Sequence, residues 1–342
     1  MYHFSNNKIG LMVAKKQKER LKKISDSLQD SLHILNGKHD CFIISILQSI
    51  KYCNTLYNEL KGDRQTIKST LLSLKCEESW INGFFNFFFA DKWCGVSFTD
   101  ARYCLFNIYE ALNEGGLLPE FDFSPSIDDQ PMDDPSYFLR WLLVNVFQRP
   151  AMNIQQTLMC STCTSCKETI NKNLEGQIDC IRIDNQEMLD NIANDGKYHS
   201  LREDTREEGS CERCCKKDVT YIDKFELQTS SATVVIDCQR ATITPIANAP
   251  TAYLEFQALK VPETIKLQSV TYYLTAALIK TGATDADGHY FLRIKVNDEL
   301  TAIVDNGSIP KKVLCYRSCN CLQSSDRARR KVSGPCGNLF CR

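Results

Sequence analysis

The hydrophobic positions repeat with a helical period in the first half of the chain. From Cys41 to Leu60 the apolar residues fall three and four positions apart, which predicts a helix. The same spacing predicts an N-terminal helix that begins in the basic run KKQKERLKK, and further helices over Arg64 to Leu74, Phe98 to Leu112 and Pro135 to Val146. We interpret the basic run as a solvated helix face, with contact to nucleic acid or nuclear import as the alternatives.

Beyond residue 155 the hydrophobic positions alternate instead. Short alternating runs predict strands over Ala232 to Ile236, Tyr253 to Phe256, Val270 to Ile279, His289 to Val296 and Thr301 to Val304. The segment from Asn185 to Gly209 is polar and aperiodic, which indicates a surface loop. Helices followed by strands are the order of an α+β fold.

Length and charge restrict the classes of protein. The 342 residues suffice for one large domain or two modest ones. With 41 basic and 42 acidic residues the net charge is −1, so no overall field favours nucleic acid or an acidic membrane. The longest apolar stretch, Ile81 to Ala90, is too short to cross a bilayer, and the first residues contain no apolar signal region. We therefore expect an intracellular protein without membrane contact.

The 18 cysteines point to a metal site, because a reducing compartment leaves few uses for disulfides. Two C-x-x-C units supply the four thiolates of a closed zinc site, and so predict one structural Zn²⁺. In the first unit Cys160/Cys163 and Cys163/Cys166 both have the required spacing. We prefer the set Cys160, Cys163, Cys211 and Cys214, which leaves Cys166 and Cys215 spare. For the cysteines and the RARRK run near the C-terminus, a disordered tail is favoured over a second metal site or an import signal.

Cys41 is a candidate nucleophile. The segment Asn36 to Asp40 is typical of a turn and delivers Cys41 to the start of the predicted helix, where backbone N–H groups and the helix dipole stabilise a thiolate. The alternative is a cysteine that only packs in the first helical turn.

His289 is the best candidate for the base, because it opens a strand that turns at Asn297 to Glu299 and returns to Val304. Folding this hairpin brings Asp305 and Asn306 beside His289. A carboxylate or an amide there can orient the imidazole. The alternative is an ordinary histidine on a surface hairpin.

Four segments in the same order resemble the ubiquitin-specific proteases. LNGKHDCFIISILQSI resembles the family's cysteine box, and GHYFLRIKVNDELTAIVDN resembles its histidine box. Between them, DDPSYFLRWLL and VVIDCQRA resemble the helix beside the cleft and the central strand. The resemblance implies a papain-like α+β catalytic domain over residues 30–313, with a thumb (30–158), fingers that contain a zinc ribbon (159–230) and a palm (231–313). A basic helical extension (1–29) would precede it, and a Cys/Arg-rich tail (314–342) would follow.

The resemblance also implies roles for the site residues. Cys41 would be the nucleophile, Asn36 the oxyanion donor, His289 the general base, Asp305 its orienting partner and Asn306 a neighbouring polar group. The expected activity is hydrolysis of the peptide or isopeptide bond after the C-terminal glycine of ubiquitin. Its partners would be ubiquitin and ubiquitinated proteins, and we expect a monomer in the cytoplasm, the nucleus or both.

Departures from the family pattern motivate other interpretations. Asp40 stands where threonine usually precedes the nucleophile, Asp287 replaces the second glycine before the histidine, and the closing aromatic strand is missing after Pro310. A catalytically weak or inactive scaffold that binds ubiquitin or a protein partner is therefore the alternative. A protease for a ubiquitin-like modifier is another.

Overall fold

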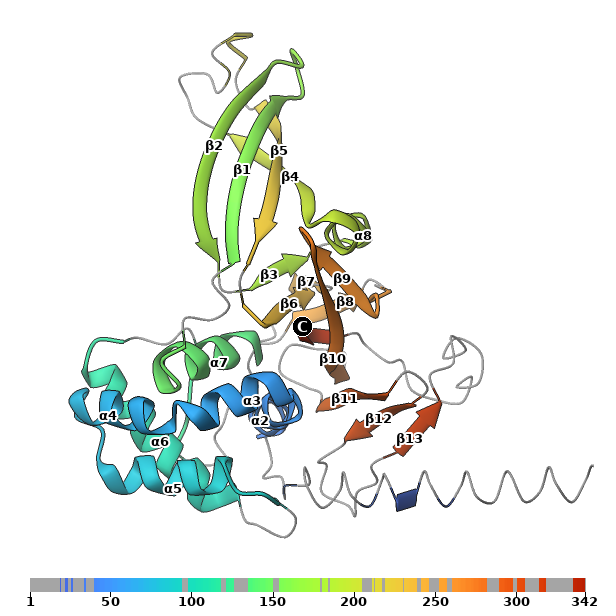
Figure 1. Cartoon of the computed structure of the whole chain (residues 1–342). Coiled ribbons are helices and arrows are strands. Elements are labelled where there is room, and N and C mark those ends of the chain that lie inside the picture. The colour runs from blue at the N-terminus through green and yellow to red at the C-terminus, as the bar shows by residue number, and fades with distance from the viewer. Residues whose placement is uncertain are drawn as a thin grey trace, which may run out of the picture.

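The chain is helical in its first half and β-rich in its second half, as the hydrophobic pattern predicts (Figure 1). The computed structural model describes residues 19, 22–23, 26, 34, 40–93, 98–117, 121–125, 135–149, 154–178, 180–183, 185–204, 211, 213–216, 219–229, 231–238, 241–245, 252–256, 260–281, 289–297, 300–304, 314–317 and 335–341. The predicted N-terminal helix lies almost entirely outside these residues.

The helical half contains α2 (Cys41–Tyr52), α3 (Asn54–Gly62), α4 (Arg64–Ser73), α5 (Glu78–Phe88), α6 (Phe98–Glu114), α7 (Pro135–Trp141) and the π-helix η1 (Leu142–Val146). The helix expected from Cys41 to Leu60 is two helices that meet at Cys53, whose ψ of 87° is not helical. Helix α5 contributes five buried apolar side chains to the core, and Trp93 stacks on Phe87 with ring centres 5.2 Å apart.

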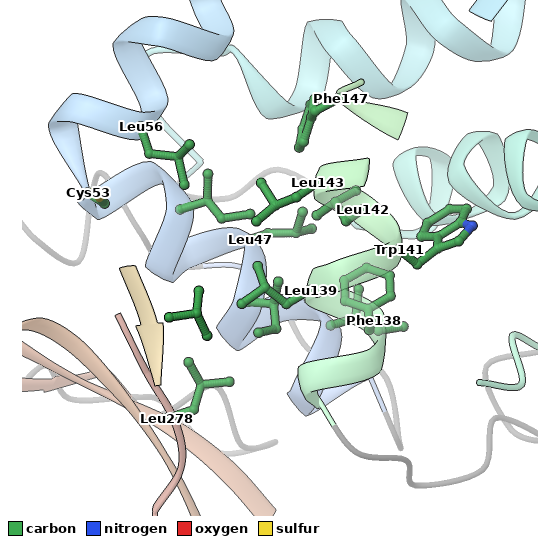
Figure 2. Close-up of a cluster of buried hydrophobic side chains, with 14 of the residues drawn as sticks. Leu47, Cys53, Leu56, Phe138, Leu139, Trp141, Leu142, Leu143, Phe147 and Leu278 are labelled. Atoms are coloured by element: carbon green, nitrogen blue, oxygen red, sulfur yellow. The ribbon is translucent and has the colours of Figure 1, made fainter. Parts of the chain in front are cut away.

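Helix α2 is the central element of the core. All ten residues from Cys41 to Ile50 are buried, which is the pattern of a helix covered on every side. Figure 2 shows that α7 and η1 cover one face through Leu139 and Leu143, while Leu278 of the sheet approaches another. Truncating a fully buried leucine such as Leu47 to alanine typically costs about 2–5 kcal/mol.

The main sheet, called the palm sheet here, has the strand order β13-β12-β11-β10-β14-β6-β3, and β9 pairs with β10. Its strands are β3 (Ile181–Ile183), β6 (Thr233–Cys238), β9 (Thr264–Leu267), β10 (Val270–Thr281), β11 (His289–Asn297), β12 (Leu300–Val304), β13 (Leu314–Arg317) and β14 (Pro335–Cys341). All neighbours are antiparallel except β3 and β6. Strands β7 (Ala241–Pro245) and β8 (Ala252–Phe256) form a separate hairpin.

The predicted hairpin that follows His289 is confirmed. Strands β11 and β12 pair antiparallel, with Leu292 opposite Val304 and Asn297 opposite Leu300. Val304, the last residue of β12, therefore lies opposite Leu292, which is three positions after His289.

Two strands lie in the region where the sequence predicted a disordered tail. Strand β13 pairs with β12 at the edge of the palm sheet, and β14 pairs with both β10 and β6 in its interior. Pro335 and Gly337 make this segment a weak strand former in isolation. Pairing along both edges of β14 holds this segment in the sheet through contacts that the local sequence does not reveal.

A second sheet, called the fingers sheet here, extends away from the palm sheet (Figure 1). It has the order β2-β1-β5-β4, with β1 (Ile154–Cys163), β2 (Thr169–Ile178), β4 (Lys197–Asp204) and β5 (Val219–Gln228). Every residue of β2 is exposed except Ile178, which is half-buried. Such a strand shows no apolar alternation, and this is why the sequence did not predict it.

The predicted loop from Asn185 to Gly209 is wrong, because this segment contains helix α8 (Gln186–Asp195) and strand β4. The Asn185 side chain accepts a hydrogen bond from the Met188 N–H at 2.8 Å and so caps the helix. Gly196 ends it with a φ of 72°, the left-handed conformation that favours glycine. The buried residues Met188, Leu189 and Ile192 have the helical spacing, although the rest of the helix is mostly polar.

Candidate active site and metal site

Cys41 is the first residue of α2, and its thiol is almost fully buried, with 2% of the residue exposed. The Ile44 N–H donates to the Asp40 carbonyl at 2.9 Å, which closes the first helical turn around Cys41. The thiol thus lies at the N-terminus of α2, which is the positive end of the helix dipole.

The histidine hairpin meets this helix terminus. The Tyr290 backbone N–H donates to the Cys41 Sγ at 3.5 Å, although the two residues are 249 positions apart. The Tyr290 ring also meets Phe42 edge-on, with ring centres 6.4 Å apart. Since His289 directly precedes Tyr290 and opens β11, the start of this strand lies beside the N-terminus of α2. His289 is half-buried.

A buried lysine lies behind this contact. Lys280 of β10 pairs with Tyr290 of β11 in the sheet, and its Nζ lies 5.7 Å from the centre of the Tyr290 ring. Only 6% of Lys280 is exposed. A buried cation was not predicted here, because Lys280 directly follows the apolar run from Val270 to Ile279, where an exposed lysine is ordinary.

Asp40, the departure noted in the sequence, forms a buried ion pair with Arg102 of α6. The Arg102 Nε donates to the Asp40 Oδ1 at 2.9 Å, and both side chains are almost completely buried. Arg102 also faces the Phe123 ring at 4.9 Å and donates to the Pro125 carbonyl at 3.2 Å. Sequence reasoning missed Arg102, since nothing in α6 marks it as different from a surface arginine.

Three of the predicted site residues lie outside the described part of the chain. They are Asn36, Asp305 and Asn306. Asp305 and Asn306 directly follow Val304, the last residue of β12.

Four cysteines of the fingers form a cluster that could hold a metal ion: Cys163, Cys166, Cys211 and Cys214, whose Sγ atoms all lie within 4.8 Å of one another. The Sγ atoms of Cys163 and Cys214 are 3.9 Å apart, and those of Cys166 and Cys211 are 3.7 Å apart. Backbone N–H groups of Cys214 and Arg213 lower the pKa of the Cys211 thiol to about 6, whereas the pKa of the Cys166 and Cys214 thiols is raised, so Cys211 is the thiol of this cluster that most readily becomes a thiolate.

This cluster corrects one of the predicted ligands, because Cys166 takes the place of Cys160. Cys160 and Cys163 both lie in strand β1, and residues three apart in a strand point to opposite faces of the sheet. Cys160 pairs with Lys224, whereas Cys163 pairs with Tyr221 and packs with it in the cysteine cluster. The pair Cys163/Cys166 spans the turn after β1, where both thiols can point to one side.

The two C-x-x-C turns have the same backbone geometry. The Lys167 N–H donates to the Cys163 carbonyl at 2.9 Å, and the Cys215 N–H donates to the Cys211 carbonyl at 2.8 Å. Lys167 has a φ of 61° and Cys215 a φ of 52°, so each turn closes with a left-handed residue directly after its second cysteine. This equivalence is independent support for Cys166 as a ligand.

Among the described residues, no helix is long and apolar enough to span a membrane.

Comparison with known proteins identifies the fold. No family model and no curated protein matches the sequence. Solved structures do match, among them a SAGA DUB module of Ubp8, Sgf11, Sus1 and Sgf73 bound to monoubiquitin (11% identity, TM-score 0.54, 90% of this chain and 68% of that chain). The same module bound to ubiquitin aldehyde matches with 10% identity, a TM-score of 0.55, and 90% and 69% coverage. A yeast SAGA DUB module with an Sgf73 mutant matches with 12% identity and a TM-score of 0.50, over 90% of this chain and 68% of that chain.

These matches and the four-cysteine cluster agree with the resemblance found in the sequence. Identities of 10–12% show the fold and nothing finer. The chain has the α+β thumb, palm and fingers fold of the ubiquitin-specific proteases, with a strongly divergent sequence.

Proposed function

We propose that this protein is a thiol-dependent deubiquitinase, which hydrolyses the bond after the C-terminal glycine of ubiquitin. The observation that carries the proposal is the hydrogen bond from the Tyr290 N–H to the Cys41 Sγ, because it joins the start of the histidine hairpin to the N-terminus of α2. The fold supports the choice of substrate, since the matching Ubp8 modules were solved with monoubiquitin and with ubiquitin aldehyde.

In this mechanism the Cys41 thiolate attacks the carbonyl carbon of the modifier's C-terminal glycine, and the bond from that carbon to the lysine nitrogen breaks. His289 takes the thiol proton and then gives it to the leaving lysine amine, and water hydrolyses the thioester. The developing oxyanion would be held by the Asn36 amide and by backbone N–H groups near Cys41. Asp305 would orient the imidazole, and Asn306 is a neighbouring polar group able to share that task.

We further propose that the metal is a structural Zn²⁺. Four thiolates about 2.3 Å from one ion at the corners of a tetrahedron are about 3.8 Å apart. The Sγ–Sγ separations of 3.7 Å and 3.9 Å agree with this geometry. The set of four sulfur ligands suits zinc and leaves no open position for catalysis. Cys163, Cys166, Cys211 and Cys214 would hold the ion.

The partners that follow from this function are ubiquitin and ubiquitinated proteins. We propose that the chain acts as a monomer in the cytoplasm, the nucleus or both, without nucleic acid or membrane. A ubiquitin-like modifier in place of ubiquitin remains the alternative substrate.

The test is reaction with ubiquitin that bears a C-terminal electrophile, followed by mass spectrometry of the adduct. The adduct should map to Cys41, and Cys41→Ala should abolish it. Turnover of a ubiquitin substrate should fall about 10²–10⁴-fold in His289→Ala, because a general base contributes about that much. His199→Ala, which removes an exposed histidine of the fingers, is the matched control and should leave turnover unchanged. An adduct on another cysteine would disprove the assignment.

A second candidate function is ubiquitin binding without efficient cleavage. The nearly complete burial of Cys41 favours it, because a nucleophile must reach its substrate. Binding of ubiquitin with neither adduct nor turnover in the wild type would establish this function in place of hydrolysis.

A further inference from the structure

Asp40 and Arg102 form an ion pair at the residue that directly precedes the proposed nucleophile in the sequence. Asp40 precedes Cys41, and the pair is shielded from water, with 0% of the Asp40 side chain and 1% of the Arg102 side chain exposed. The ion pair between Arg149 and Asp63 differs from it, because these side chains are 38% and 51% exposed. Exposed pairs contribute little, whereas breaking a buried pair leaves an uncompensated charge.

The burial of Asp40 creates an electrostatic problem for a thiolate at Cys41. A carboxylate close to an ionising thiol disfavours the thiolate, because two negative charges repel strongly where water is excluded. Arg102 removes this effect, since its guanidinium makes the net charge of the pair zero. Its further contacts with Phe123 and the Pro125 carbonyl hold the guanidinium in place from another segment of the chain.

We propose that Asp40 and Arg102 are positioning residues for Cys41. The pair fixes the first turn of α2 and presents no net charge to the thiol, so that the thiolate forms beside a buried carboxylate without repulsion. This inference rests on the proposed function, in which Cys41 is the nucleophile.

Other charged and titratable groups also lie on the elements that pack against this end of α2. They are His289 and Tyr290 on β11, Lys280 on β10, and Tyr137 and Arg140 on α7. None of them replaces Arg102, because the hydrogen bond at 2.9 Å couples Arg102 directly to the residue before Cys41.

The test measures the rate at which iodoacetamide alkylates Cys41 between about pH 6 and pH 10, a range that spans the ionisation of ordinary thiols. Mass spectrometry of the tryptic peptide 39–51 separates Cys41 from the other cysteines. Arg102→Met should shift the midpoint of the rate-against-pH profile to higher pH by about one unit. This shift corresponds to about a tenfold loss of rate at neutral pH. Asp40→Asn should shift the profile to lower pH, because the Asp40 carboxylate then no longer offsets the positive charge of the Arg102 guanidinium.

Three further variants separate charge from structure. The double variant Asp40→Asn/Arg102→Met should return the profile to that of the wild type, and Arg102→Lys, which keeps the charge, should leave it in place. Arg149→Met removes the exposed pair and should change nothing. Thermal melting shows which variants fold, and if Arg102→Met does not, Asp40→Asn and Arg102→Lys decide the question.

Equal losses of rate at every pH in Asp40→Asn and Arg102→Met would show that the pair only supports the fold, and would overturn the inference. So would an unmoved profile in a folded Asp40→Asn variant. The reagent needs no ubiquitin. A profile that moves as expected in a protein that does not react with the ubiquitin probe would therefore reject the proposed function and keep this inference.

Discussion

At the residue scale, helix α2 contains two buried serines whose hydroxyl groups differ. The Ser49 Oγ donates to the Ile46 carbonyl at 2.7 Å. Among the described residues, the Ser45 Oγ has no hydrogen-bond partner, and Ser45 is completely buried. A buried hydroxyl without a partner costs stability.

We therefore predict that Ser45→Ala raises the free energy of unfolding by about 1 kcal/mol, because it removes this cost and places a better helix former in α2. Ser49→Ala is the matched control, and its stability should stay within about 0.5 kcal/mol of the wild type, since the Ile46 carbonyl keeps its place in the helix. Urea denaturation of both variants measures the difference. A loss of stability in Ser45→Ala would show that the hydroxyl is bonded after all.

Two thiols away from the site should resist alkylation. Burial raises the pKa of Cys76 to about 11, and burial together with the charge of Asp237 raises the pKa of Cys180 to about 11. Both remain protonated at pH 8, so iodoacetamide should label them slowly, with a rate that rises about tenfold per pH unit until about pH 11. Labelling of either residue as fast as a free cysteine would contradict the prediction.

The same shifts have a consequence for stability at alkaline pH. In the unfolded chain a thiol has a pKa of about 8.5. Between there and about pH 11 the unfolded chain loses these protons while the folded chain keeps them, so folding stability falls as the pH rises. Cys180→Ala should make this decline shallower in melting curves recorded across that range.

At the scale of elements, the two C-x-x-C turns each carry a side chain in the left-handed region. This conformation strains residues other than glycine, and a compatible glycine removes the strain. Lys167→Gly and Cys215→Gly should therefore each raise stability, by about 0.5–1 kcal/mol. Lys172→Gly is the matched control, because Lys172 is exposed in strand β2 and should lose stability on the same change. Chemical denaturation with the metal bound measures all three, and a destabilised Lys167→Gly variant would argue against the turn geometry.

The elements that the sequence predicted are those with a strong internal pattern. The hairpin after His289 alternates along both strands and has a polar turn, so its position was predictable to within one residue. Strand β2 of the fingers was missed because it is exposed along its length, and α8 was missed because its three buried side chains stand in an otherwise polar segment. The capping residues Asn185 and Gly196 were the available signals for α8.

For the candidate site, the sequence supplied hypotheses for single residues only. The turn before a helix indicated Cys41, and a strand opening indicated His289. Arg102 and Lys280 were not predictable, because their burial depends on α6 and β10 packing beside α2 and β11. To choose between Cys160 and Cys166 one must know that β1 ends at Cys163, because a strand places residues three apart on opposite faces.

At the scale of the whole molecule, the buried apolar side chains of the described residues form two clusters. The large one joins the thumb helices, the palm sheet and the base of the fingers through Ile154, Tyr198 and Leu227. The small one consists of Cys163, Cys211 and Tyr221, with Cys166 and Cys214 packed against it. A cluster of this size cannot stabilise the end of a sheet by apolar burial alone. The end of the fingers sheet should therefore depend on the metal, whereas the large cluster should not.

We predict that a zinc chelator unfolds the end of the fingers locally and leaves the rest of the molecule folded, because binding of a structural metal supplies the folding free energy of its own region. Hydrogen exchange should increase over residues 160–170 and 211–225, while the amides of α2 stay protected. Cys166→Ser should have the same effect without a chelator and should lose the one zinc ion per chain. Cys160→Ser, the matched control on the other face of β1, should keep both the metal and the protection. If Cys160→Ser loses the zinc and Cys166→Ser keeps it, the ligand set of the structure is wrong, and a loss of protection in α2 on chelation would show that the fingers and the core unfold as one unit.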